Sequence, residues 1–203
     1  MQILDISNGL LTAEVYPEDP IPELAPMQAL DDGDLYNVNA LYASLHNGTH
    51  MDAPLHVFSD GADIASVPLD LCIGPCHVLT VPPGLITGDY MEKHYPKDAT
   101  KILLKSGGKA FLHDSAVNVL LENGCTLVGT DALSVESFDG TGTVHRALLN
   151  RGTLLLEGLN LEDAKDGEYF LFAAPVKIDG GEAGFVRAVL IEDYIFWSGK
   201  QHE

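Results

Sequence analysis

Residues 46–56 read HNGTHMDAPLH and hold three of the chain's eight histidines and one aspartate: His46, His50, Asp52 and His56. A helix is disfavoured here because Gly48 and Pro54 both fall in this short window. In a straight strand His46 and His50 would lie about 13 Å apart at ~3.3 Å per residue. One ion could not contact both, because a metal–nitrogen bond is ~2.0–2.1 Å long. The chain must therefore bend back, and Gly48 can adopt the backbone angles of a tight turn.

These side chains are the usual donors of a divalent metal site. Two imidazoles and a carboxylate brought to one point suit a borderline or hard ion such as zinc, manganese or iron(II). The alternative is a polar loop whose histidines hydrogen-bond to backbone or water, and for any single histidine that interpretation is favoured. The four side chains together, in one bent segment, favour metal binding.

Two further candidate ligands, His145 and Glu157, lie far downstream. A helix over residues 145–151 advances about 10 Å at ~1.5 Å per residue. If the chain reverses at Gly152, a strand over residues 153–157 returns about 13 Å at ~3.3 Å per step. Glu157 then comes back to the level of His145, so the two could share an ion, with a surface role for Glu157 as the alternative.

The remaining chain alternates apolar runs with two helices. Continuous apolar runs, typical of strands covered on both faces, are residues 76–81, 101–106, 125–129, 153–159, 168–176 and 185–191. One helix can be capped by Asp114 or Ser115 and ends before Gly124, and Thr143 can cap a second. We find no repeat or linker, so we expect a single domain over residues 1–203. The expected fold class is α/β with a mixed β-sheet.

The N-terminal part of the chain is less regular. Residues 2–6 and 10–15 are expected to form two strands around a turn at residues 7–9. Residues 16–36 contain four prolines and are expected to form a long loop, which in a compact domain is usually functional. Residues 37–45 are again typical of a strand.

Charge excludes whole classes of partner. The chain has 203 residues, with 11 Lys plus Arg against 30 Asp plus Glu, for a net charge of −19. It offers no basic patch for nucleic acid and none for an anionic membrane surface. No apolar run approaches the ~18 residues of a membrane span. We expect small neutral or cationic partners, metal ions included.

Cysteine usage indicates the compartment. The three cysteines, Cys72, Cys76 and Cys125, are too few and odd in number for a disulfide framework. All three lie among apolar residues, where a buried thiol behaves as a small hydrophobe. We therefore expect free core thiols and a reducing, cytoplasmic setting.

The segment HNGTHMDAPLH resembles the His-x-Gly-Thr-His-x-Asp-x-Pro-x-His signature of the cyclase-family metal-dependent hydrolases, among them the kynurenine formamidases. All seven fixed positions match. The stretches DGADIASVPLDLCIGP, LVGTDALSVE and FAAPVKIDGGEAGFVRAVLI are also similar to that family. The resemblance implies a compact swivelling β/β/α domain and a homodimer or homotetramer.

The resemblance also implies a role for each residue of the candidate site. His46, His50 and Asp52 would bind one metal ion, and Asp52 would bridge to a second ion held by His145 and Glu157. His56 would be the catalytic acid/base, with a metal ligand or an orienting residue as the alternative. The chain would bind one or two ions, with zinc as the first expectation and manganese as the second.

The implied reaction is hydrolysis of a small amide. The leading substrate is N-formylkynurenine, giving kynurenine and formate. The alternatives are ring-opening of a cyclic amide, as in the isatin hydrolases, and a metal-binding protein without turnover. Tyr16 stands where the formamidases carry a tryptophan that contacts the substrate, so we expect it to form a wall of the substrate pocket. Asp131 could orient a ligand histidine, although capping of a turn is the favoured role.

Overall fold

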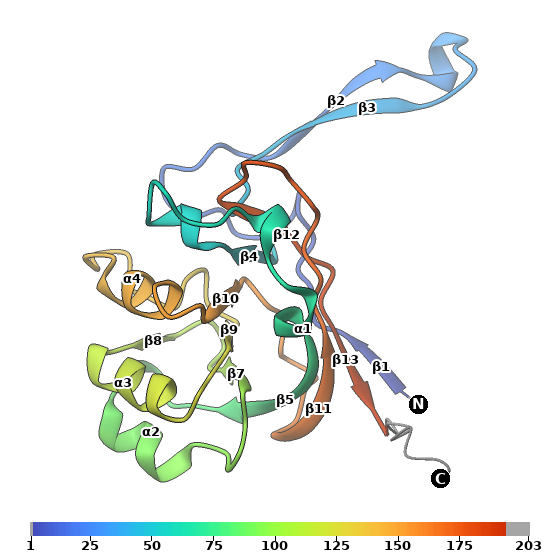
Figure 1. Cartoon of the computed structure of the whole chain (residues 1–203). Coiled ribbons are helices and arrows are strands. Elements are labelled where there is room, and N and C mark those ends of the chain that lie inside the picture. Colours follow the sequence, from blue (N-terminus) through green and yellow to red (C-terminus); the bar gives the residue numbers. More distant parts are fainter. Residues whose placement is uncertain (1, 194–203) are drawn as a thin grey trace, which may run out of the picture.

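Nine strands form one mixed sheet in the computed structural model, which describes residues 2–193 (Figure 1). In their order across the sheet these are β1 (Gln2–Asp5), β13 (Val189–Glu192), β11 (Gly167–Phe172), β5 (Ile73–Thr80), β7 (Lys101–Lys105), β9 (Leu127–Thr130), β10 (Leu154–Glu157), β4 (His50–Asp52) and β12 (Ala183–Phe185). Two small sheets pair β2 (Glu23–Gln28) with β3 (Val38–Tyr42) and β6 (Gly84–Ile86) with β8 (Ala110–Leu112). The α-helices are α1 (Leu69–Cys72), α2 (Gly88–His94), α3 (Asp114–Glu122) and α4 (Thr143–Leu149).

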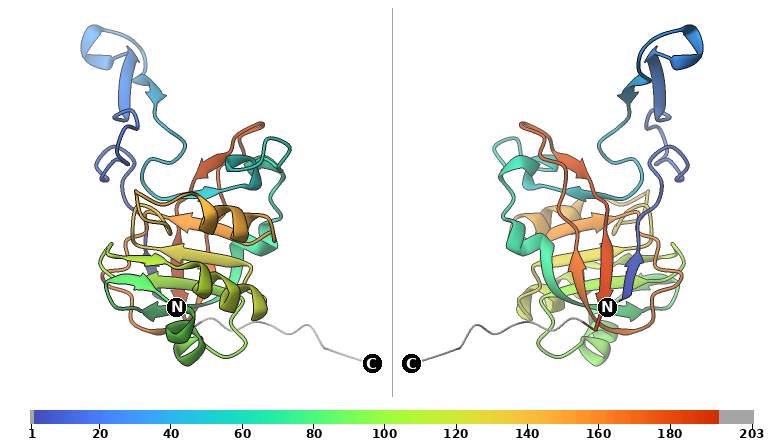
Figure 2. Two further views of the ribbon diagram at one scale, coloured as in Figure 1. Left: turned by 90° about the vertical axis from the view of Figure 1, so that its left-hand side faces the viewer. Right: turned by 90° about the vertical axis from the view of Figure 1, so that its right-hand side faces the viewer.

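The centre of the large sheet is parallel and its flanks are antiparallel. Strands β5, β7, β9 and β10 run parallel, whereas every pairing outside them is antiparallel. Seen from the side, β11 and β13 run steeply across the direction of the central strands, so the sheet curls into a half-barrel (Figure 2). The predicted α/β class with a mixed sheet is confirmed.

Apolar side chains cover both faces of the central strands. Along β7, Ile102 and Leu104 belong to the cluster that includes residues of α2, α3 and α4, whereas Leu103 belongs to the cluster on the opposite face. A strand buried on both sides needs no polar alternation, which explains the continuous apolar runs in the sequence. The three cysteines are free and buried in these clusters, as predicted.

Both predicted helices are present, but the sequence misplaced their caps. The N-cap of α3 is His113, whose Nδ1 accepts a hydrogen bond from the Ser115 amide, and Asp114 is the first helical residue. Helix α4 begins at Thr143 behind Gly142, so Thr143 lies inside the helix and does not cap it. Within residues 2–193 no helix has the length and apolar content to cross a membrane.

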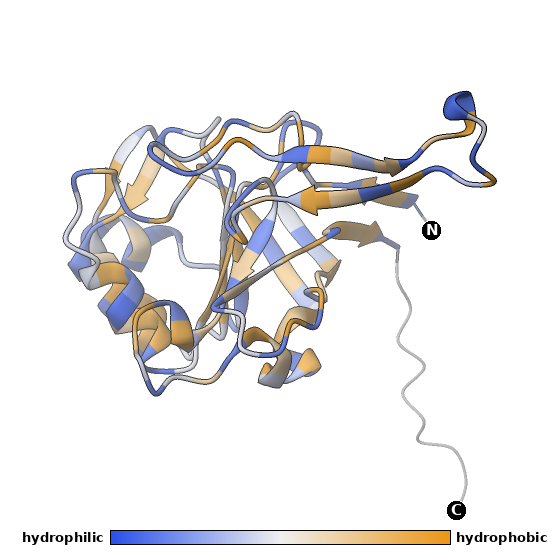
Figure 3. Ribbon diagram, turned by 90° about the horizontal axis from the view of Figure 1, so that it is seen from above, coloured by the Kyte–Doolittle hydropathy of each residue, from blue (hydrophilic) through white to orange (hydrophobic). Residues whose placement is uncertain are grey.

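Two N-terminal predictions were wrong. Residues 10–15 contain no strand: residues 10–12 form a turn, which the amides of Thr12 and Ala13 close by donating to the Gly9 carbonyl, and residues 13–15 are irregular. The predicted loop over residues 16–36 contains β2, which forms a ribbon with β3 that projects from the body (Figure 3). Pro26 is tolerated because each strand of a two-stranded ribbon has one unpaired side. Residues 38–42 form the expected strand.

Candidate metal centre and active site

The bend at Gly48 brings His46 next to His50. Gly48 has a φ of +64°, in the left-handed region that favours glycine. A Cβ atom there would lie 3.1 Å from the Leu10 Cα, so the neighbouring loop leaves little space for a side chain. The centroids of the two imidazole rings are 5.0 Å apart. The reversal predicted from the motif is confirmed.

Strand β4 presents His50 and Asp52 to the end of β10. Glu157 is the cross-strand partner of His50 in the antiparallel pairing of the two strands. Directly opposed residues project their side chains from the same face of a sheet. The Nε2 atom of His50 accordingly lies 3.6 Å from Oε2 of Glu157.

Asp52 lies at the centre of the cluster and is completely buried. Its Oδ1 atom is 3.1 Å from Nδ1 of His46 and 3.5 Å from Nε2 of His50. Its Oδ2 atom is 3.9 Å from Nε2 of His145. One carboxylate therefore faces three imidazoles.

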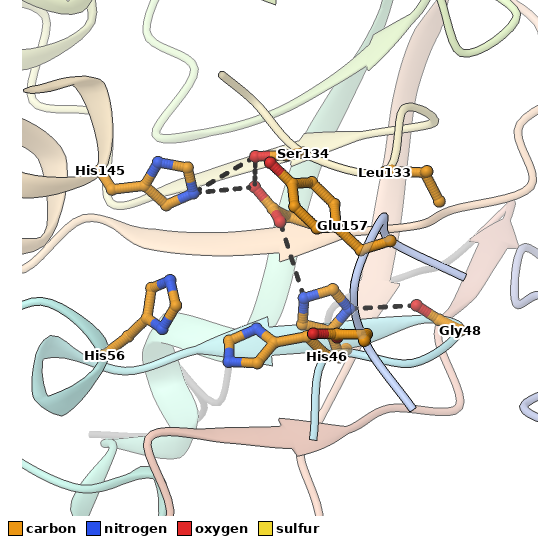
Figure 4. Close-up of a pocket in the computed structure, with 10 residues that line it drawn as sticks. His46, Gly48, His56, Leu133, Ser134, His145 and Glu157 are labelled. Carbon is orange, nitrogen blue, oxygen red and sulfur yellow. Dashed lines mark hydrogen bonds and ion pairs between the residues drawn. The ribbon is translucent and has the colours of Figure 1, made fainter. Parts of the chain in front are cut away.

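His145 approaches the cluster from α4. Its Nε2 atom lies 3.5 Å from Oε1 of Glu157 (Figure 4). Its Nδ1 atom lies 3.0 Å from Oε2 of Glu136. The approach of His145 and Glu157 predicted from the lengths of the helix and strand is confirmed.

His56 lies beside the cluster, at the end of the 3₁₀ turn Pro54–His56. Its ring centroid is 4.4 Å from that of His46 and 5.7 Å from that of His145 (Figure 4). Partial burial lowers the pKa of His56. The negative charge of Asp52 acts to raise this pKa, and the neighbouring His46 and His145 act to lower it further. The ring is therefore held neutral near neutral pH.

Burial and charge oppose each other at the core of the site. Burial alone would lower the pKa of His50 and of His145, but the Glu157 carboxylate, helped by the charge of Asp52, raises them to about 9 and about 10. Burial would raise the pKa of Glu157, yet its contacts with the two histidines hold it well below its usual range. Two buried carboxylates thus require positive charge close to them.

This donor set fits a divalent metal ion. Within residues 2–193, the buried side-chain atoms without a hydrogen-bond partner are Asn47 Nδ2, His50 Nε2 and both carboxylate oxygens of Asp52. Buried polar atoms are almost always hydrogen-bonded, and a bound cation would satisfy three of these four. Two sets of these residues each offer three potential ligand atoms that lie within 4.8 Å of one another. One set is His46, Asp52 and His56, and the other is His50, Asp52 and Glu157.

These two sets divide the side chains differently from the family resemblance. The resemblance groups His46 with His50 and leaves His56 outside the ligands, whereas proximity groups His56 with His46. Asp52 belongs to both sets, as expected of a bridging carboxylate. All six residues predicted for metal binding and acid/base chemistry are gathered at one point.

A cavity of about 230 Å³ opens onto this cluster. Tyr16 and Asp19 from the N-terminal segment line it together with Leu133, Ser134 and the histidines of the cluster. Tyr16 is thus at the predicted pocket wall. Its ring centroid lies 5.7 Å from that of Phe138, which is 59% exposed.

The sequence analysis missed three residues of this region: Ser134, Glu136 and Phe138. The hydroxyl of Ser134 lies 3.4 Å from Nε2 of His145 and donates to Oε1 of Glu157 at 3.3 Å. Ser134 and Glu136 lie in the stretch LVGTDALSVE, and the similarity of that stretch to the family was the only indication in the sequence that they have a role. Asp131, in the same stretch, accepts hydrogen bonds from the amides of residues 106–108, which confirms the turn-capping role.

Comparison with known proteins places this geometry in a family. The model of the cyclase family, described as "Putative cyclase", matches residues 5–137. A kynurenine formamidase of Erythrobacter litoralis is 36% identical, with 94% of each chain aligned. A kynurenine formamidase of Salinibacter ruber is 34% identical over 94% of this chain and 97% of its own.

The fold is also found among solved structures. A protein described as a potential metal-dependent hydrolase with cyclase activity superposes with a TM-score of 0.81 at 27% identity, covering 93% of this chain and 96% of its own. The curled mixed sheet and the buried His/Asp/Glu cluster are therefore set in a known architecture. The chain belongs to the cyclase family of metal-dependent hydrolases.

Proposed function

We propose that this chain hydrolyses a small amide, with N-formylkynurenine as the leading substrate and kynurenine and formate as products. The observation that carries the proposal is the fully buried Asp52 carboxylate, which makes no hydrogen bond at either oxygen and faces three imidazoles that line an open cavity. The substrate assignment is supported by relatives that carry the name kynurenine formamidase and align along nearly the whole chain.

The proposed ligands are His46, His50 and Asp52 for one ion, and Asp52, His145 and Glu157 for a second. Zinc is the first expectation because its site is typically built from imidazole and carboxylate donors, and manganese is the alternative. A bound divalent cation supplies Lewis acidity to the amide carbonyl and lowers the pKa of water toward neutrality.

His56 is proposed to move the proton. Amide hydrolysis needs a base for the attacking water and an acid for the departing amine, and a neutral imidazole can serve first as one and then as the other. The lowered pKa of His56 keeps its ring available as a base at neutral pH. Its position beside His46 and His145, at the edge of the cluster, supports this role.

Tyr16 is proposed as the wall that contacts the substrate's aromatic ring. It lines the cavity, and the centroid of its ring lies 5.7 Å from that of Phe138. An aromatic pair at this position favours a flat apolar group on the substrate. The three buried thiols support a cytoplasmic setting for the protein. The assembly that the family resemblance implies, a homodimer or homotetramer, is also part of the proposal.

The test begins with elemental analysis of chelator-treated protein reconstituted with zinc or with manganese. Formate release from N-formylkynurenine is then measured on the same sample. One or two ions per chain with turnover would support the proposal. Metal without turnover would reject this substrate and direct the assay to cyclic amides, and failure to bind either metal would overturn the site itself.

A further inference from the structure

The turn that carries Tyr16 also brings Asp19 to the cavity. Residues 16–19 form a β-turn, in which the Asp19 amide donates to the Tyr16 carbonyl at 3.1 Å. Pro17 stands at the second position, and Glu18, at the third, has a φ of +77°, the combination of a type II turn. The first and the last residue of this turn both line the cavity.

The carboxylate of Asp19 is unpaired. The residue is partly buried, and its carboxylate makes no hydrogen bond and no ion pair with any group of residues 2–193. The other carboxylate that lines the cavity, and its four imidazoles, are all proposed to bind metal or to move the proton. Among the lining residues, Asp19 is therefore the one charged side chain that the proposed reaction does not use.

No cationic side chain balances this carboxylate at the cavity. In the part of the chain that the structure describes, neither Lys nor Arg lines the cavity or the two hollows that share wall residues with it. Burial raises the pKa of the Tyr16 hydroxyl, and the negative charges of Glu157, Glu136 and Asp19 raise it further. A molecule in the cavity thus meets negative charge at this wall, and a positive group on that molecule would be its complement.

We infer that Asp19 is a specificity-determining residue that binds an ammonium group on the tail of the substrate. The inference rests on the proposed amide hydrolysis and extends it to the substrate's side chain. A carboxylate and an ammonium group form a charge-assisted hydrogen bond, which is stronger than a bond between neutral groups. No lining residue offers a matching cation, so a carboxylate on the same tail has no side-chain partner and should be dispensable.

The spacing within the turn suits an aromatic ring with a short cationic tail. The Cα atoms at the two ends of a β-turn, here those of Tyr16 and Asp19, lie within about 7 Å of each other. In N-formylkynurenine the ammonium nitrogen is four bonds from the ring, a span of at most about 6 Å at ~1.5 Å per bond. One substrate can therefore contact Tyr16 with its ring and Asp19 with its ammonium group.

The test measures steady-state kinetics on three formylated arylamines that differ only in the tail. N-formylkynurenine carries an ammonium group and a carboxylate, N-formylkynuramine carries the ammonium group alone, and 2-formamidoacetophenone carries neither. The variant is Asp19→Asn, which keeps the shape of the side chain and the backbone amide that closes the turn. The control is Glu18→Gln, which removes the same charge from the same turn at an exposed side chain that does not line the cavity.

We expect Asp19→Asn to raise KM for both ammonium substrates by about 10- to 100-fold, the usual loss for a hydrogen bond to a charged group, with little change in kcat. The neutral substrate should be unaffected, and Glu18→Gln should match the natural chain on all three. N-formylkynuramine should have a kcat/KM at least equal to that of N-formylkynurenine. An equal loss on charged and neutral substrates, or a natural chain that requires the carboxylate, would overturn the inference.

Binding of the product amines separates this inference from the proposed reaction. Calorimetry measures the Kd of kynuramine, which carries the ammonium group, and of 2-aminoacetophenone, which does not, and neither is turned over. If none of the three amides is hydrolysed, the reaction is rejected, yet tighter binding of kynuramine that is lost in Asp19→Asn still supports the ammonium site. Equal binding of the two amines, or no binding of either, overturns it.

Discussion

Oε2 of Glu136 lies 3.0 Å from Nδ1 of His145, and this contact decides which ring nitrogen of His145 faces the cluster. With Nδ1 donating to Glu136, the Nε2 atom is left free to face Glu157 and Asp52. The carboxylate is itself held in place, because Oε1 accepts a hydrogen bond from the Gly142 amide at 2.8 Å. A Cβ atom on Gly140 would lie 2.5 Å from Cγ of Glu136, so only glycine leaves room for this side chain.

Removing this carboxylate should weaken metal binding. We expect Glu136→Ala to lower metal affinity by about 10- to 100-fold, the usual effect of losing a partner that orients a ligand histidine. Glu136→Gln keeps a hydrogen-bond acceptor and should lose less, and Gly140→Ala should resemble Glu136→Ala by displacing the carboxylate. Competition with a chelating dye measures the affinity. Glu162→Ala, at an exposed position, is the control; equal affinities in Glu136→Ala and the control would contradict the orienting role.

The sequence predicted most of this site because its information is local. Residues 46–56 required a bend whatever the rest of the fold, and helix and strand lengths sufficed to bring His145 back to Glu157. Strand pairing is different. That Glu157 lies directly across from His50 depends on the register of β10 against β4, two strands about a hundred residues apart in the chain. No local pattern specifies that register.

The same reasoning explains what the sequence missed. Glu136 and Phe138 lie in the irregular segment between β9 and α4, where neither spacing nor periodicity predicts the direction of a side chain. Residues 16–36, which contain β2, are expected from sequence to form a loop because four prolines disfavour a helix or a central strand. A two-stranded ribbon with open edges tolerates them.

Replacing His56 by alanine should separate proton transfer from metal binding. We expect His56→Ala to retain its full metal content while the rate of formate release falls by about 10²- to 10⁴-fold, the range typical of losing a general acid or base. Elemental analysis and a formate assay on one preparation measure both quantities. His94→Ala, an exposed histidine stacked on Tyr90, is the control. Loss of an ion on His56→Ala would instead make this residue a ligand, in agreement with its proximity to His46 and Asp52.

The aromatic wall should determine how well an aryl substrate binds. We expect Phe138→Ala to raise KM for N-formylkynurenine by about 2- to 10-fold with little change in kcat, because an aromatic contact contributes about 0.5–1.5 kcal/mol. Phe172→Ala, at the end of β11, removes an exposed ring that does not line the cavity and should leave KM unchanged. Steady-state kinetics test this expectation, and an unchanged KM in Phe138→Ala would exclude this ring from binding.

Enlarging the wall should favour the formamidase substrate. Tyr16→Trp introduces the indole that the resemblance to the formamidases implies at this position, and we expect it to raise kcat/KM for N-formylkynurenine. A cyclic amide assayed in parallel shows whether the gain is specific. No gain, or a loss, would count against N-formylkynurenine as the natural substrate.

The buried thiols should be inert in the folded protein. Burial raises the pKa of Cys72 and of Cys125 to about 11 and the pKa of Cys76 to about 12. The pKa of each thiol is higher in the folded chain than in the unfolded one, so the folded state favours the neutral thiol. The free energy of unfolding therefore keeps its full value below about pH 8.5, the ordinary pKa of cysteine, and falls as the pH rises from there through 11–12. Iodoacetamide should label no cysteine between pH 7 and 9 unless denaturant is added. A native thiol that labels with a midpoint near its ordinary pKa would contradict the burial.

Metal removal should destabilise the folded chain, and the stabilisation by metal should depend on the carboxylate of Asp52. A ligand that binds only the folded state at 100 times its Kd adds about 2.7 kcal/mol to the free energy of unfolding, so zinc should raise the denaturation midpoint of the natural chain. Asp52→Asn removes the carboxylate common to both groups of ligand atoms and should abolish this rise. Asp60→Asn, on an exposed loop, should retain it. Urea titrations with zinc and with chelator measure the difference, and a zinc-dependent rise that survives in Asp52→Asn would place the ion away from this carboxylate.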